Sequence, residues 1–336
     1  MTTPTPIVSV ILPFHREKFF LAESIDSILQ QSLTKLEIIL IASDADAATF
    51  SIAEQHAKKD DRIRLLIAPA PGLSNALNYG LQHATAPFIA RMDADDIAAP
   101  ERLEKQIRFL QNNPTIGVVS CQTSGTPSSQ QSTGIDNYIQ WQNSLITPET
   151  HYTNRFIESP IAHPTVVFRK SIYEQHGGYS TEGIPEDYDR WLHWMAMGIR
   201  FQKIPEVLLY WRDHPDRLTR TSADYALHQF TKVKAGYFKQ WLAKKGIQKR
   251  VIVCGAGPEA RKKAAIFETA GIDIAGFSDL VKREIPDKIF LPETEIQAGS
   301  QWYFLSLLAG RGKAAEMDAF LRNRGLRPGK DYTIAA

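Results

Sequence analysis

The sequence predicts an α/β protein with a mostly parallel sheet flanked by helices, followed by a second, smaller α/β unit. Near-continuous apolar runs at 7–14, 36–42 and 63–68 alternate with helical patterns, which is typical of parallel strands covered on both faces. Another strand, a glycine-rich turn and a helix begin at 249. With 336 residues, the chain is long enough for two domains.

Predicted strands and helices alternate through the first half of the chain. Phe20, Ile25 and Leu29 lie at helical spacing. Ser74 predicts the N-terminal cap of a later helix, and Pro100 fits the first turn of another. These patterns predict helices at 17–31, 47–58, 73–84 and 100–112, and strands at 87–92 and 116–121.

The second half begins with a weaker pattern. Residues 124–134, SGTPSSQQSTG, predict a surface loop. Helices are expected at 170–176 and 185–197, and Trp191 and Trp194 of the second are expected in the core. We divide the chain into a catalytic domain at 1–220, a basic amphipathic helical linker at 221–248 and a small domain at 249–336.

The composition excludes several classes of protein. A net charge of +2 predicts no nucleic-acid partner. Two cysteines, Cys121 and Cys254, indicate neither a disulfide framework nor a metal-binding pair, as expected for a reducing compartment. The N-terminal residues do not resemble a signal peptide, and no apolar run approaches the roughly 18 residues of a membrane span. We therefore expect a cytoplasmic protein, to which the sequence assigns no oligomeric state.

Three carboxylates, on Asp93, Asp95 and Asp96, follow the apolar run 87–92. Carboxylates this close raise one another's pKa unless a cation offsets them. Mg²⁺ or Mn²⁺ does so with oxygen ligands from carboxylates and phosphates. The alternative is that the acidic residues, Asp96 above all, stabilise the N-terminus of the helix near Pro100. These residues alone leave both interpretations open.

A second acidic pair, Glu186 and Asp187, begins the helix predicted at 185–197. A carboxylate there is a candidate general base if an acceptor hydroxyl comes within hydrogen-bond reach. The alternative is again acidic charge at a helix N-terminus.

Several segments, in this order, resemble the family-2 glycosyltransferases of the GT-A fold. The resemblance covers about residues 7–220 and is most specific at 88–106. It implies metal-dependent, inverting transfer of a sugar from a nucleotide-diphosphate donor to a hydroxyl acceptor in surface polysaccharide or lipopolysaccharide synthesis. The segments are VSVILPF, LEIILIAS, GLSNALNYGL, FIARMDADDIAAPERLEKQ, HPTVVFRKS, GGY, PEDYDRWL and VLLYWRDHPDRLT.

The resemblance also implies roles for individual residues. Asp187 is the implied catalytic base, with Glu186 beside it. Asp95 is the implied ligand of Mg²⁺ or Mn²⁺, joined by Asp93 and His214. The implied nucleotide-sugar contacts are Pro13, His15, Ser43, Asp44, Asn75, Asn78 and Asp93.

The resemblance also indicates the chemical class of the sugar donor and of the acceptor. Ala42 and Ser43 stand where the family has an aspartate pair, and acidity returns at Asp44. A UDP-sugar is the favoured donor, and the acceptor is a saccharide or a lipid-linked saccharide. The basic stretch 225–250 either touches an anionic membrane as a peripheral contact or packs on the protein with its lysines in water.

The C-terminal segment VIVCGAGPEA resembles the start of a Rossmann-like domain. Gly255 and Gly257 fit the turn, Ala260 replaces the third glycine, and Asp279 lies where an acidic ribose ligand is expected. One alternative function is therefore an NAD-binding enzyme. Another is a non-catalytic nucleotide-sugar-binding protein, which the change to Ala42 and Ser43 motivates.

Overall fold

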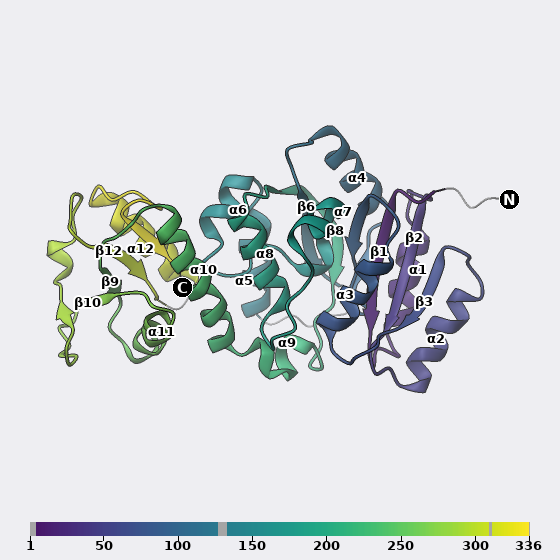
Figure 1. The fold of residues 1–336 in the computed structure, drawn as a ribbon, viewed down its shortest axis with the longest axis horizontal. Helices are drawn as coiled ribbons and strands as arrows, with labels where there is room; N and C mark the ends of the chain where they lie inside the picture. Colours follow the sequence, from purple (N-terminus) through teal and green to yellow (C-terminus); the bar gives the residue numbers. More distant parts are fainter. Residues whose placement is uncertain (1–4, 127–132, 309–310, 336) are drawn as a thin grey trace. The chain divides into compact units, whose positions relative to one another are not determined.

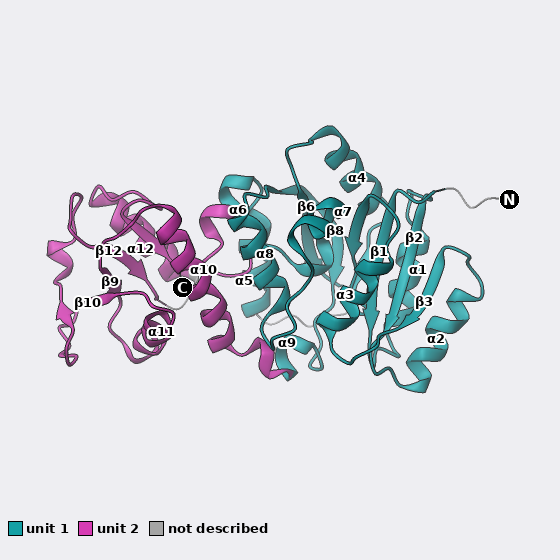
Figure 2. Cartoon of the chain, viewed as in Figure 1, with its two compact units in different colours: residues 1–151, 160–221 teal, residues 152–159, 222–336 magenta. Residues whose placement is uncertain are grey.

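The computed structural model describes residues 5–126, 133–308 and 311–335 (Figure 1). The chain divides into two compact units (Figure 2). One comprises Met1–His151 and Pro160–Thr221, and the other Tyr152–Ser159 and Ser222–Ala336. No pattern in the sequence indicated that 152–159 would pack with the C-terminal part of the chain.

The first unit contains an eight-stranded sheet. Most neighbouring strands are parallel, and β7 and β5 run antiparallel to the strands they pair with. This mixed α/β architecture confirms the predicted fold class. In spatial order the strands are β3 (Ile63–Ile67), β2 (Leu36–Ala42), β1 (Val8–Phe14), β4 (Phe88–Arg91), β7 (Val167–Arg169), β6 (Val118–Gly125), β8 (Phe201–Trp211) and β5 (Ile97–Ala98).

Helices cover both faces of this sheet. Successive strand residues point to opposite faces, so β1 places Val10 and Leu12 in one core and Ile11 in the other. The first core includes α1 (Leu21–Leu29), α2 (Ala47–Ala57) and α4 (Arg102–Asn112). The second includes α3 (Leu73–His83), α7 (Lys170–His176) and α8 (Glu186–Ala196). This unit also contains α5 (Thr133–Ser144) and α9 (Leu218–Thr221). Helix α6 (Pro148–Asn154) begins in this unit, and its last residues, from Tyr152, belong to the second.

The short strand β7 lies between β4 and β6 in the sheet. It has only three residues, and the chain reaches it through a 3₁₀ turn, η1 (His163–Thr165). Because β7 is antiparallel to both β4 and β6, those two strands run in the same direction. Their carboxyl ends therefore meet at one edge of the sheet, with η1 near the end of β4, where Arg91 N donates to Val166 O.

The structure corrects one local prediction, confirms another and describes only part of a third. Ser74 is not a cap: α3 begins at Leu73 and its N-cap is Gly72, whose φ of 104° favours glycine. Trp191 and Trp194 are fully buried, as predicted. The loop predicted at 124–134 falls mainly on 127–132, outside the described residues, whereas β6 extends to Gly125 and α5 begins at Thr133.

Among its described residues, the second unit contains a five-stranded parallel sheet and three complete α-helices. Helix α10 (Leu227–Lys244) belongs to this unit, and its Phe238 and Trp241 contact Phe156 of the 152–159 segment. In the described parts of both units, no helix combines the length and apolar character needed to cross a bilayer. The other elements are β11 (Ile289–Phe290), β10 (Ile274–Ser278), β9 (Val251–Cys254), β12 (Tyr303–Ser306), β13 (Tyr332–Ile334), α11 (Pro258–Thr269) and α12 (Arg311–Asn323).

Candidate active site

The three carboxylates after β4 converge at the carboxyl edge of the first sheet. One potential ligand oxygen each from Asp93, Asp95 and Asp96 lies within 4.8 Å of the others. Asp93 and Asp95 keep 30% and 19% of their side-chain surface exposed, whereas Asp96 is fully buried. Two of the three carboxylates therefore remain accessible to a ligand.

Cationic and donor groups make this crowding of carboxylates tolerable. The buried Arg91 guanidinium forms an ion pair with Asp93. His214 Nε2 lies 2.9 Å from Asp95 Oδ2, and this hydrogen bond raises the pKa of His214 despite partial burial. His214 thus lies beside the acidic triplet, and its role as a metal ligand stays a prediction.

Asp96 has a structural role that the sequence did not indicate. Its Oδ1 accepts a hydrogen bond of 2.9 Å from Arg212 N, just after β8. Burial, followed by repulsion from Asp95 and Asp93, raises its pKa. The helix-terminus interpretation is wrong, because β5 follows Asp96 directly and α4 begins only at Arg102.

Arg212 holds the loop of the acidic triplet against α1. Its Nη1 donates to Asp95 O at 2.9 Å, and its Nη2 lies 2.6 Å from Glu23 Oε2. The guanidinium stacks over the Phe20 ring, 4.2 Å from the centroid, and that ring also contacts His214. The chain after β8 thus fixes both the backbone and the side chain of Asp95.

A second acidic group lies at the start of α8. Burial, followed by repulsion from Glu186, raises the pKa of Asp187 to about 6. His163 Nδ1 lies 3.5 Å from Glu186 Oε1, and its Nε2 lies 2.9 Å from the Tyr179 hydroxyl. Burial lowers the pKa of His163 to about 3, so this imidazole is neutral; it forms a hydrogen bond with Tyr179 and lies against Glu186.

The predicted nucleotide contacts at β1 and β2 come together. Pro13 pairs in register with Ile41, which places the ends of these strands side by side. His15 Nδ1 lies 2.7 Å from Ser43 O, and Gly72 N donates to Ser43 Oγ at 3.0 Å. Asp44 has a φ of 51°, and its exposed carboxylate lies 3.7 Å from Arg16.

The two asparagines of α3 have different environments. Asn75 Nδ2 donates locally to Pro71 O at 2.7 Å. Asn78 uses both ends of its amide on the backbone of Tyr179: Nδ2 donates to the carbonyl at 2.8 Å and Oδ1 accepts from the amide at 2.7 Å. This geometry does not support the predicted donor contact of Asn78 and favours a positioning role.

Sequence reasoning missed several groups of this site. Arg91 had a detectable signal, because it is a lone charge at the end of an otherwise apolar strand. Arg212 and Tyr179 had none, because their contacts arise only from tertiary pairing. Glu17 also faces the acidic edge: burial, followed by repulsion from Asp95, raises its pKa.

Comparison with known proteins identifies the family of this chain. Residues 9–177, half of the chain, match the profile described as Glycosyl transferase family 2. The chain belongs to this family. A relative named O-antigen biosynthesis glycosyltransferase WbnJ, from Escherichia coli, is 32% identical over 67% of this chain and 89% of its own length. The glycosyltransferase assignment is thereby confirmed.

Solved structures share the fold of this glycosyltransferase. TarS 1-349 from S. aureus in complex with UDP-GlcNAc aligns with a TM-score of 0.56 and 16% identity, covering 78% of this chain and 71% of the 1-349 chain. The mannosyltransferase PcManGT from Pyrobaculum calidifontis, in complex with GDP-Man and Mn²⁺, aligns at 0.50 with 23% identity, covering 80% and 74%. Both agree with the GT-A fold that the resemblance implied.

The glycine-rich turn of the second unit is bonded internally. Gly255 has a φ of 101°, and a Cβ there would lie 2.5 Å from the Leu308 side chain. Ala256 N donates to Asp279 Oδ2 at 2.7 Å. Asp279 therefore occupies the backbone N–H of Ala256, which a pyrophosphate would otherwise use. Pro258, at the start of α11, has no backbone N–H to offer. This geometry does not favour the NAD-binding alternative.

Proposed function

We propose that this chain is an inverting, metal-dependent glycosyltransferase that moves a sugar from a nucleoside diphosphate to a hydroxyl acceptor. The observation that carries the proposal is the pair of acidic groups at one sheet edge: Asp93 and Asp95 after β4, and Asp187 at the start of α8. The turn η1 supports assigning both groups to one site, because Arg91 N donates to Val166 O at its end and its His163 lies 3.5 Å from Glu186 Oε1, next to Asp187. A single displacement needs no enzyme nucleophile.

The donor set at the acidic edge suits a hard divalent cation. Carboxylate oxygens are the ligands that Mg²⁺ and Mn²⁺ prefer, and two accessible carboxylates leave room for phosphate oxygens. Asp95 and Asp93 would hold the ion, with His214 adjacent. Bound there, the ion would neutralise the charge that develops on the leaving diphosphate.

The residues of the chain supply the remaining chemistry. Asp187 accepts the proton of the acceptor hydroxyl, and a pKa of about 6 makes it a stronger base than an ordinary aspartate while leaving it ionised at neutral pH. Glu186 and His163 contribute to its electrostatic environment, and Tyr179 forms a hydrogen bond with His163. Pro13, His15, Ser43 and Asp44, at the ends of β1 and β2, form the nucleoside side of the site, with Asn75 nearby.

For substrates, we propose a UDP-sugar donor and a saccharide or lipid-linked saccharide acceptor. A relative from Escherichia coli, named UDP-Gal:alpha-D-GlcNAc-diphosphoundecaprenol beta-1,3-galactosyltransferase, is 27% identical over 70% of this chain and 84% of its own length. Together with the O-antigen relative, it supports a role in surface polysaccharide synthesis. We place the enzyme in the cytoplasm, in peripheral contact with the membrane.

The test combines binding and turnover. A thermal-shift panel of UDP, GDP and dTDP with Mn²⁺ should give the largest stabilisation with UDP. Donor turnover should require Mn²⁺ or Mg²⁺ and fall at least about a hundredfold in Asp187→Asn. Glu182→Gln, an exposed acid just before this helix, is the matched control and should keep full activity. A wild-type protein that binds no nucleoside diphosphate would refute the proposal.

A further inference from the structure

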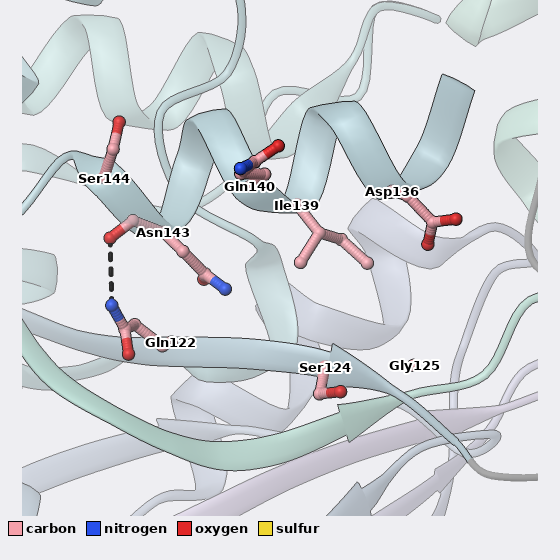
Figure 3. A pocket seen from close by; sticks show the side chains of 8 residues that line it. All are labelled: Gln122, Ser124, Gly125, Asp136, Ile139, Gln140, Asn143 and Ser144. Carbon is pink, nitrogen blue, oxygen red and sulfur yellow. Dashed lines mark hydrogen bonds between the residues drawn. The ribbon is translucent and has the colours of Figure 1, made fainter. Parts of the chain in front are cut away.

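An open cavity lies in the first unit, between β6 and α5 (Figure 3). Its volume is about 420 Å³, within the usual range of ligand sites. Figure 3 shows the Ile139 side chain directed from α5 toward the end of β6 that carries Ser124. The lining residues are Gln122, Ser124, Gly125, Asp136, Ile139, Gln140, Asn143 and Ser144.

The walls of this cavity are fixed by hydrogen bonds. Asn143 Oδ1 accepts from Thr123 N at 3.0 Å, and its Nδ2 donates to Thr123 O at 2.7 Å. Gln122 Nε2 donates to Asn143 O at 3.1 Å (Figure 3). The side of α5 that faces the cavity is therefore tied to β6, so a ligand would meet a largely preformed site.

The lining predicts the class of ligand. It offers amides, hydroxyls, one carboxylate and one aliphatic side chain, and none of the eight lining residues is a lysine or arginine. Such a surface disfavours a phosphate or another anion. It suits a neutral molecule that carries many hydroxyl groups and one less polar face, which is the chemistry of a sugar.

The cavity lies on the same face of the sheet as the proposed base. Phe201 of β8 packs against Trp191 of α8 with 5.9 Å between ring centroids. Lys203, two residues later, points to the same face, and its buried ammonium donates to Gln142 O of α5. Helices α5 and α8 therefore cover one face.

One end of the cavity, at Ser124 and Gly125, lies at the same edge of the sheet as the acidic triplet. β6 runs parallel to β8, so Gly125 pairs with Trp211 at the carboxyl ends of both strands. The next residue, Arg212, bonds Asp95 O and Asp96 Oδ1. The end of the cavity at Ser124 and Gly125 is thus one strand away from the segment that fixes the acidic site.

From this placement, we propose that the β6–α5 cavity is a subsite for a neutral saccharide unit of the acceptor, beyond the sugar that receives the transferred residue. This inference rests on the proposed function, because it presumes a saccharide acceptor. It assigns α5 to acceptor recognition and predicts that longer acceptors are preferred over monosaccharides.

The experiment compares wild type with two cavity variants. Ser124→Trp fills the cavity from an exposed strand end, and Gln140→Ala removes an exposed amide. Asn137→Ala, exposed on the same helix but absent from the lining, is the matched control. The probes are labelled mono-, di- and trisaccharides of glucose, galactose and N-acetylglucosamine. Binding is measured by saturation-transfer NMR without donor, and UDP binding is measured separately by thermal shift.

We expect at least one trisaccharide probe to bind wild type and Asn137→Ala equally. Ser124→Trp should lose that binding, and Gln140→Ala should weaken it about fivefold, as for one lost hydrogen bond. Monosaccharide binding and UDP stabilisation should be unchanged in all variants. The proposed subsite would be refuted if no trisaccharide probe binds wild type, or if a probe binds wild type and Ser124→Trp equally well. A wild-type protein that UDP does not stabilise would instead count against the proposed function.

Discussion

Asn78 holds the backbone of Tyr179 with both ends of its amide, at 2.8 and 2.7 Å, across 101 residues of sequence. Tyr179 in turn places its hydroxyl 2.9 Å from His163, which lies against Glu186. A residue of α3 therefore sets the position of groups around the proposed base. A Cβ on neighbouring Gly178 would lie 2.1 Å from Asn78 Oδ1, so the contact has little room to adjust.

We expect Asn78→Ala to lower kcat about tenfold while leaving UDP affinity unchanged. The substitution leaves the Tyr179 amide and carbonyl without these partners, which costs on the order of 1–3 kcal/mol of stability. The melting temperature should fall by several degrees. Asn75→Ala, which loses only a local bond to Pro71, is the control for stability. A selective loss of UDP affinity in Asn78→Ala would show that Asn78 contacts the donor after all.

The rate of transfer should depend on the ionisation of Asp187. Its pKa of about 6 means that the carboxylate form, which acts as base, accumulates as the pH rises through 6. We expect kcat to increase over this range and level above pH 7. Repulsion from Glu186 contributes to the raised pKa, so Glu186→Gln should move the inflection to lower pH. An unchanged inflection in Glu186→Gln would contradict this assignment.

Ionisation of the Asp187 carboxyl group should lower the free energy of unfolding at neutral pH. The folded pKa of about 6 lies above the ordinary value of 3.8, so folding is penalised by ionisation. The penalty is absent below pH 3.8, grows between pH 3.8 and 6, and is complete above pH 6. Asp187→Asn should therefore be more stable than wild type at pH 7.5, by on the order of 1–3 kcal/mol, with a smaller difference at pH 4.5. Denaturant titrations in EDTA at both pH values test this, and a destabilised variant at pH 7.5 would refute it.

The sequence was sufficient to predict β1–β4, β6, α1–α4, α7 and α8, because the apolar periodicity of these elements reflects their burial. It also located Asp93 and Asp95, since a loop that follows a buried parallel strand must lie at the carboxyl edge. It did not predict α5 or α6, which lie in the stretch of weak pattern after β6. Local pattern could not reveal the antiparallel insertion of β7, which has only three residues. Nor could it assign Asp96, whose partner Arg212 lies 116 residues away, or the clamp that Asn78 forms on Tyr179.

His214 should contribute to metal affinity through Asp95. Its Nε2 lies 2.9 Å from Asp95 Oδ2, within reach of an ion held there. We expect His214→Ala to weaken Mn²⁺ binding about 10- to 100-fold, as for other residues that orient or ligate a metal. Calorimetric titration of Mn²⁺ in the presence of UDP measures this effect. His228→Ala, an exposed histidine in the second unit, is the control, and equal Mn²⁺ affinity in wild type and His214→Ala would rule out this role.

Arg91 should be needed for both the fold and the acidic site. The guanidinium is 2% exposed and pairs with Asp93 through Nη2, while Nε and Nη1 have no hydrogen-bond partner among the described residues. Arg91→Met would leave Asp93 without its cation, so we expect a loss of about 3–5 kcal/mol in stability and weaker Mn²⁺ binding. Arg91→Lys keeps the charge and should restore part of both.

The matched control for Arg91 is Arg108→Met, which breaks an ion pair with Glu104 on the surface of α4. That pair is exposed on one turn of helix, so its loss should cost less than about 0.5 kcal/mol. Denaturant titration and Mn²⁺ calorimetry on Arg91→Met, Arg91→Lys and Arg108→Met separate the loss of the buried ion pair from the loss of the exposed one. If Arg91→Met unfolds too readily for calorimetry, Arg91→Lys still decides the issue. Its ammonium cannot reproduce the fork of donors toward Asp93, so wild-type Mn²⁺ affinity in that variant would show that the site does not depend on how Arg91 holds Asp93.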